Sequence, residues 1–148
     1  MVLLVVHLVA VWFLVGLIWV VQTLLYPGFA AVGDAPDAPD ARWRAHHDRH
    51  TRVMGRLVMG PWAVQGATTA ALLVVRPAGV PFWLVALAGV WGLVTLGVTV
   101  GVSVPCHRRL SAGFDAAVLD RLVTTNWWRT AAWTAGGVTS VALLHSAL

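Results

Sequence analysis

The chain has 148 residues, of which 59% are hydrophobic and only 11% are charged. This composition excludes an ordinary soluble globular domain and indicates a chain that lies mostly in lipid. The formal net charge of +4 rests on arginine, with no lysine, and basic residues flanking membrane spans explain it better than a nucleic-acid surface does. We therefore predict an all-α membrane protein, with residues 1–148 as a single integral membrane domain and no nucleic-acid partner.

The first predicted span covers about residues 3–25. No charged side chain occurs before Asp34, and the apolar run is long enough to cross about 30 Å of hydrocarbon. The alternative, a secretory signal peptide, would need a basic start and a shorter apolar run. Tyr26 and Pro27 are predicted to end the span at the membrane interface, where aromatic residues and helix-stopping prolines are common.

Residues 28–41 are predicted to form an extended polar loop, because each proline disfavours helix in the residue before it. A basic segment, 42–52, then begins a helix that continues into the second span, over about residues 57–75. Pro61 and Gln65 lie inside this span, one turn apart. The amide of Gln65 therefore needs a partner within a helix bundle.

Three histidines lie in the basic segment. His46 and His50 are four residues apart, so on a helix their imidazoles share one face, as in a two-histidine metal site. We expect both rings to face the bundle axis, on a helix continuous with the second span. The spacing does not decide the role of His47, which is three residues before His50. Solvated histidines on a basic helix are the alternative interpretation.

The third span is predicted over about residues 82–104, after a short turn at 76–81, and it ends just before Pro105 and His107. The next segment has an apolar stripe of helical period. It predicts a helix capped by Ser111 that lies at the membrane surface or extends the fourth span, about residues 130–144. Asn126 is expected to cap this last span or to orient a ligand through its amide.

The arginines predict the orientation of these spans. Nine of the ten lie on the side of the first and third connections, residues 28–50 and 105–129, and only Arg76 lies on the other side. Short loops rich in arginine stay in the cytoplasm. We therefore predict a multi-pass protein of the inner (cytoplasmic) membrane, an antiparallel up-down bundle of four transmembrane helices with both termini outside.

Such a bundle gathers polar side chains from all four helices at its cytoplasmic end. These side chains are Gln22, Tyr26, His46, His50, Arg52, His107, Asn126 and Arg129. Ionisable groups at membrane depth are candidates for function. His46, His50 and His107 are candidate ligands of a transition metal such as copper, iron or zinc. Tyr26, Arg52, Asn126 and Arg129 are candidate catalytic residues.

Each candidate also has a structural interpretation. As site residues, Arg52 and Arg129 would hold an anionic or quinone oxygen. The structural alternative is that they extend to the membrane surface, as arginines commonly do. Tyr26 has an alternative role in the aromatic belt, and His107 as a cation at a helix C-terminus. Gln22 and Gln65 are candidate cofactor-binding residues, because an amide in lipid requires a hydrogen-bond partner.

Several short motifs together resemble a family of small four-span bacterial membrane proteins of unassigned function. The motifs are Tyr26-Pro27, His46-x3-His50-x-Arg52, Pro61, Pro105-x-His107 and Asn126-Trp127-x-Arg129-Thr130. They cover nearly the whole chain and are distantly similar to the anthrone-oxygenase-like membrane proteins. The resemblance implies an oxygenase or metal-dependent activity on a small lipophilic molecule. The chain departs from it at Gln65, where the family pattern implies a glutamate.

Two functions are consistent with these features. The first is an integral membrane enzyme, a metal-dependent redox enzyme or oxygenase, that acts on a small aromatic or quinone-like molecule at the cytoplasmic face. The second is a non-catalytic accessory or assembly subunit, whose basic face binds anionic lipid, a second copy or another membrane protein. A haem site agrees less well with the sequence, because the histidines are near the interface and do not face each other at mid-membrane. A transporter is the weakest alternative, because it would show repeats or paired broken helices.

Overall fold

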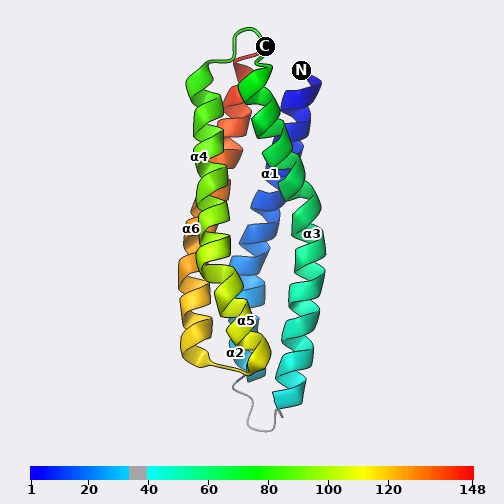
Figure 1. Cartoon of the computed structure of the whole chain (residues 1–148), viewed down its shortest axis with the longest axis vertical. Helices are drawn as coiled ribbons and strands as arrows, with labels where there is room; N and C mark the ends of the chain where they lie inside the picture. Colours follow the sequence, from blue (N-terminus) through cyan, green and yellow to red (C-terminus); the bar gives the residue numbers. More distant parts are fainter. Residues whose placement is uncertain (34–39) are drawn as a thin grey trace.

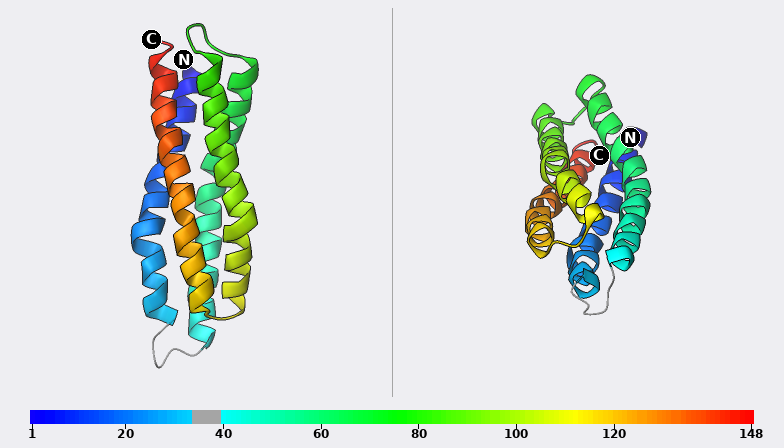
Figure 2. Two further views of the ribbon diagram at one scale, coloured as in Figure 1. Left: turned by 90° about the vertical axis from the view of Figure 1, so that its left-hand side faces the viewer. Right: turned by 60° about the horizontal axis from the view of Figure 1, so that its bottom comes forward.

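The computed structural model describes residues 1–33 and 40–148, which form helices without any strand. The helices make four antiparallel rods that lie side by side (Figure 1). The elements are α1 (Val2–Val20), the π-helical turn η1 (Val21–Leu25), α2 (Tyr26–Gly33), α3 (Asp40–Val74), α4 (Phe82–Val98), the π-helical turn η2 (Thr99–Ser103), α5 (Val104–Ala112) and α6 (Ala116–His145). Figure 2 shows both termini and the α3–α4 turn at one end, and the α5–α6 turn at the other.

The predicted all-α class is confirmed, and three of the rods have the length and apolar composition of membrane spans. Within the described residues, Val2–Gly33, Asp40–Val74 and Phe82–Ala112 are long and apolar enough to span a bilayer. The rod formed by α6 does not reach the same apolarity, because it carries Asn126, Arg129, Thr130 and other polar residues on its buried face. The crossing of α6, and with it the four-span bundle, therefore remains a prediction.

The first and third rods each continue through a proline. Tyr26 N–H donates to Val21 O and Val104 N–H donates to Thr99 O, in the i to i−5 pattern of a π-helical turn. A proline ring clashes with the carbonyl four residues earlier, and for Pro27 and Pro105 that carbonyl falls inside the π-helical turn. The helix therefore does not stop at Tyr26-Pro27, where the sequence predicted the end of the first span, but continues to Gly33.

Two further boundaries differ from the sequence-based predictions. The predicted loop over 28–41 is helical at 28–33 and 40–41, and its centre, 34–39, lies outside the described residues. Asp115, and not Ser111, caps the last rod: its carboxylate accepts hydrogen bonds from the N–H groups of Ala117 at 3.0 Å and Val118 at 3.1 Å. Asn126 does not cap a helix either, since it lies inside α6.

The basic helix is continuous with the second predicted span, as expected. The rod formed by α3 runs from Asp40 to Val74 through both Gly55 and Pro61. The predicted direction of the histidines is wrong for His46, whose side chain is exposed, and the fully buried ring is that of His47. Neighbouring helix positions differ by about 100°, so only one of the two can face inward.

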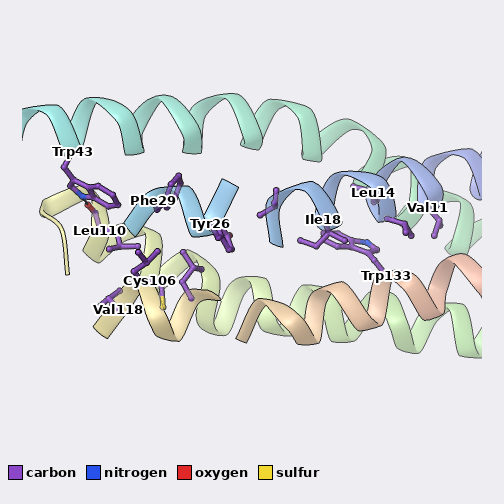
Figure 3. Close-up of a cluster of buried hydrophobic side chains, with 14 residues drawn as sticks. Val11, Leu14, Ile18, Tyr26, Phe29, Trp43, Cys106, Leu110, Val118 and Trp133 are labelled. Carbon is purple, nitrogen blue, oxygen red and sulfur yellow. Dashed lines mark hydrogen bonds between the residues drawn. The ribbon is translucent and has the colours of Figure 1, made fainter. Parts of the chain in front are cut away.

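The core explains how α1 and α6 come together. α1 is apolar all around, yet it buries one stripe that includes Leu4, Val11 and Leu14 at helical spacing. Gly137 lets α6 approach this stripe closely, because an added Cβ there would lie 3.2 Å from Val15. The buried cluster that includes Val11 and Leu14 continues through Tyr26 and Trp43, and it joins α1, α2, α3 and α5 (Figure 3).

We expect a thiol introduced after Leu148 to react with a membrane-impermeant maleimide added outside intact cells. The reason is the distribution of arginine, since nine of ten lie toward the opposite end of the bundle. The single native cysteine, Cys106, is buried, and its replacement by alanine supplies the background for labelling. Reaction only after the membrane is opened would reverse the predicted orientation.

Candidate functional site

A cavity of about 500 Å³ lies among the four rods. Most of its lining is apolar, from Leu14 and Ile18 in α1 to Trp62 in α3. The polar lining is concentrated toward the α5–α6 end, and it includes Tyr26, Ser103, His107 and Arg129, together with His50. The size and the few convergent polar groups are typical of a small-molecule site.

A histidine cluster lies at the polar end of this cavity, and two of its members, His50 and His107, line the cavity. The Tyr26 hydroxyl lies 3.3 Å from His107 Nε2, and His107 Nδ1 lies 3.1 Å from His47 Nε2. The other nitrogen of His47, Nδ1, lies 3.2 Å from Ser111 Oγ. The His50 ring is 6.0 Å from the His107 ring between centroids. Three imidazoles from two rods are thus in one place, and both nitrogens of His47 and of His107 have partners.

Aromatic side chains hold the cluster in position. The Trp43 indole N–H donates to Leu110 O at 2.7 Å, which fixes α3 against α5. The same indole stacks on His47, with ring centroids 5.5 Å apart and an angle of 25° between the planes. The Phe29 and His50 rings are nearly perpendicular, with an angle of 84° between their planes and 4.7 Å between their centroids. These contacts remove His47 from solvent and restrict its ring orientation.

A second polar group, the amide–guanidinium network of Gln22, Asn126 and Arg129, lies deeper between α6 and the first rod. Asn126 Nδ2 donates to Gln22 Oε1 at 2.6 Å, and Gln22 Nε2 donates to the carbonyl of Val123 at 3.3 Å. Arg129 donates to Asn126 Oδ1 at 3.0 Å. All three side chains are buried, so the network keeps their polar atoms paired in a low-dielectric environment.

Arg129 is nevertheless incompletely satisfied. Its side chain is only 8% exposed, yet in the described residues its Nε has no hydrogen-bond partner and no carboxylate lies within ion-pair distance. The same terminal nitrogen that donates to Asn126 also lies 3.4 Å from Ser103 Oγ. The guanidinium carbon sits 5.1 Å from the centre of the Trp133 ring, and the Trp133 N–H donates to Gln65 Oε1 at 3.1 Å. A buried cation without a counter-charge is costly unless something pairs with it.

The structure brings together most, but not all, of the candidate residues. Those that meet around the cavity or its adjoining network are Gln22, Tyr26, His50, His107, Asn126 and Arg129. Gln65 joins through Trp133. His46 and Arg52 are exposed, and His46 lies edge-on to Phe29 at 5.5 Å. His47 occupies the inward place that was expected for His46.

The geometry of the histidines suits hydrogen bonding more than metal binding. In the described part of the chain, no group of three or more histidine, cysteine, aspartate or glutamate side chains is placed to hold a metal ion. Both ring nitrogens of His107 are engaged by Tyr26 and His47, and a metal ligand needs a free lone pair. The predicted set of His46, His50 and His107 is therefore not assembled in this arrangement.

Four site residues were not singled out from the sequence: Ser103, Ser111, Trp133 and, as a definite choice, His47. For His47 a signal existed. Trp43, His47, His50 and Met54 recur at intervals of three or four, which places them on one helix face. No comparable pattern marks Ser103 or Ser111, because a lone serine at the end of an apolar span is common.

Comparisons with protein-family models, curated proteins and solved structures found no match to this chain. A function must therefore be inferred from the chemistry of the site and not from the fold, since four-helix bundles serve many functions. The features of the site that bear on its chemistry are the cavity, the Arg129 guanidinium without a counter-charge and the histidine cluster.

Proposed function

We propose that the protein is an integral membrane enzyme that binds a small lipophilic aromatic molecule bearing a phenolic or quinone-like oxygen. Arg129 would hold this oxygen, and the Tyr26–His107 pair would exchange a proton with it. The buried guanidinium of Arg129, which has no carboxylate partner among the described residues and a free Nε, carries the proposal. It lines the cavity, it lacks a counter-charge, and a substrate oxyanion would supply one.

The remaining lining supports an aromatic ligand. Trp62 and Trp133 present their rings to the cavity, and their centroids lie 6.2 Å apart in an edge-on arrangement. Aromatic and aliphatic walls with few polar groups favour a ligand that is apolar except for one or two oxygens. Such a molecule partitions into the bilayer, so it would reach the site from lipid.

The mouth of the cavity fits that route. Met59 on α3 and Leu96 and Val100 on the facing rod all line the cavity, and all three are also exposed. An exposed apolar opening between two candidate spans would face hydrocarbon and not water. A ligand could therefore pass between α3 and the α4–α5 rod without crossing a polar surface.

The chemistry we infer is acid–base catalysis at the ligand oxygen. The Tyr26 hydroxyl is in contact with His107, whose imidazole can accept or return its proton. Arg129 would stabilise the resulting oxyanion inside the dry cavity. A redox or oxygenase reaction, as the resemblance implies, would use the same binding and deprotonation steps but needs an additional oxidant.

The experiment measures the binding of a nitronaphthol, whose anion absorbs visible light, to detergent-purified protein. We expect saturable binding with an absorbance change, and weaker binding of nitronaphthalene, which lacks the oxygen. Gly55→Phe should then reduce nitronaphthol affinity at least tenfold. Gly55 lines the cavity with open space at its Cβ position, so the new ring would occupy the mouth without a clash.

Gly60→Phe is the matched control. Gly60 lies on the same helix, also has open space at its Cβ position, and does not line the cavity. We expect it to leave affinity unchanged. Equal affinities for the two probes, or equal losses in both variants, would overturn the proposal. The accessory-subunit hypothesis, in which the basic end anchors the protein to anionic lipid or a partner, would then replace it.

A further inference from the structure

Four side chains at the site form one unbroken chain of hydrogen bonds. It runs from Tyr26 on α2 to His107 on α5, then to His47 on α3, and it ends at Ser111 on α5. The three steps measure 3.3 Å, 3.1 Å and 3.2 Å between the nitrogen or oxygen atoms. Proton transfer along such a chain needs donors and acceptors at these separations and in an uninterrupted order.

The chain has two equivalent polarities. In the first, Tyr26 donates to His107 Nε2, His107 Nδ1–H donates to His47 Nε2, and His47 Nδ1–H donates to Ser111. In the second, every donor and acceptor is exchanged, and Ser111 donates inward. Both imidazoles are neutral in either polarity, with one N–H each, and all three hydrogen bonds are kept. Neither polarity leaves a buried polar atom of the chain without its partner.

The two ends of the chain meet different surroundings. Tyr26 is buried and lines the cavity that also contains Arg129. Ser111 also lines this cavity, but at its far end, where the serine is half-buried. There His47 Nδ1 lies 4.0 Å from the exposed carboxylate of Asp48. Trp43 and Phe29 cover the middle of the chain. The charged or titratable groups near the chain are Cys106 and Arg129 around Tyr26, His46, Asp48 and His50 around the two imidazoles, and Arg108, which lines the cavity together with Ser111.

We propose that Tyr26, His107, His47 and Ser111 form a proton relay between the buried part of the cavity, at Tyr26 and Arg129, and the water near Asp48. This inference rests on the proposed function for the source of the proton, a phenolic O–H of the ligand. A proton that passes from the ligand to the Tyr26 oxygen displaces the tyrosine proton onto His107 Nε2. The Nδ1 proton of His107 passes to His47 Nε2, that of His47 passes to Ser111, and the serine proton leaves to water.

This transfer converts the first polarity into the second, and atoms and charge balance. One proton leaves the ligand, one proton reaches water, and the ligand stays behind as an anion opposite Arg129. A bound aromatic ligand would displace water from the buried part of the cavity, and the hydrogen-bonded chain gives the proton a route that does not depend on water there. The chain regains its first polarity when a proton taken up from water at Ser111 passes back along it, and Tyr26 gives its proton to the anionic oxygen of the bound molecule.

The test mixes the nitronaphthol rapidly with protein in lightly buffered solution, at a pH where most of the free probe is neutral. A pH dye reports the released proton, and the probe reports its anion. We expect His47→Gln to slow both signals at least tenfold with little change in affinity. His47 does not line the cavity, and an amide can bridge His107 and Ser111 but does not relay a proton.

His46→Gln is the control, because His46 is exposed and not part of the chain, and its signals should match those of the parent. Proton release at the parental rate in His47→Gln would overturn the relay. Nitrogen NMR of labelled histidine tests it without any ligand, since the two polarities require His47 and His107 to carry their protons on the same type of nitrogen. Opposite tautomers of His47 and His107 would also overturn the relay. If the tautomers match but the probe does not bind, only the proposed function is overturned.

Discussion

Replacement of Arg129 by glutamine is expected to lower the affinity for the nitronaphthol about 100-fold, which corresponds to about 2.7 kcal/mol at 25 °C. The guanidinium is the cavity's buried cation, and its Nε has no partner among the described residues. A charge-assisted hydrogen bond in a dry site contributes this much free energy, and glutamine provides no charge. Affinity for nitronaphthalene, which has no oxygen, should change by less than about threefold.

Two further variants make this prediction specific. Arg129→Lys keeps the charge but loses the planar group that lies over Trp133, so we expect an intermediate loss of affinity. Arg121→Gln removes an exposed arginine from the same helix and should leave affinity unchanged. Binding that depends equally on Arg121 and Arg129 would indicate a general attraction of the anion to a basic surface, and it would contradict a specific site.

Thermal unfolding of the ligand-free protein should separate this effect from misfolding. A buried charge without a counter-ion destabilises the folded state, so Arg129→Gln is expected to unfold at the same temperature as the parent or at a higher one. The amide can still donate toward Asn126. A variant that loses both affinity and several degrees of stability would show that Arg129 mainly supports the fold.

The rods were predictable because their signals are averages over many residues. Long apolar runs, a proline–glycine turn and the one-sided arginines suffice to predict antiparallel helices and their order. The ends of the rods were less predictable. Pro27 and Pro105 carry a local signal for a helix end, and in the structure a π-helical turn just before each proline lets the helix continue.

The choice between His46 and His47 shows why the site was harder to predict than the fold. The i,i+4 pair His46 and His50 matches a familiar metal motif, but the motif says nothing about which helix face is inside. Trp43, Gln65 and Leu72 are buried, and extending their stripe along α3 reaches His47 and not His46. The sequence of an apolar span does not show which helix face is buried, since nearly every position in it is hydrophobic.

The end of the bundle where polar side chains gather could be predicted from the sequence, but the individual contacts between rods could not. They depend on how far each helix slides and rotates against its neighbours, which no periodicity within one helix specifies. Gln65 illustrates the point. Its amide oxygen accepts the Trp133 N–H, a contact that joins two rods, and the need for an acceptor at position 65 is visible only once both residues are placed.

The second large effect is expected at Asn126, which connects Gln22 to Arg129. Asn126→Ala would leave Gln22 Oε1 without its donor and would remove an acceptor of the Arg129 guanidinium, both in buried positions. Each unsatisfied buried polar group costs about 1–3 kcal/mol. We therefore expect a loss of about 2–4 kcal/mol in unfolding free energy, measured by denaturant titration in detergent micelles, together with weaker nitronaphthol binding.

Asn126→Asp separates the effect of Asn126 on stability from its effect on nitronaphthol binding. The new carboxylate would still accept from Arg129, and it would also supply the counter-charge that the guanidinium lacks. If a ligand oxyanion normally fills that role, this variant should lose nitronaphthol affinity at least as strongly as Arg129→Gln, while its stability falls less than that of Asn126→Ala. Thr124→Ala, at an exposed position on the same helix, serves as the control for both measurements. Undiminished binding by Asn126→Asp would mean that the ligand does not neutralise Arg129, because the internal carboxylate and the ligand anion would compete for one guanidinium.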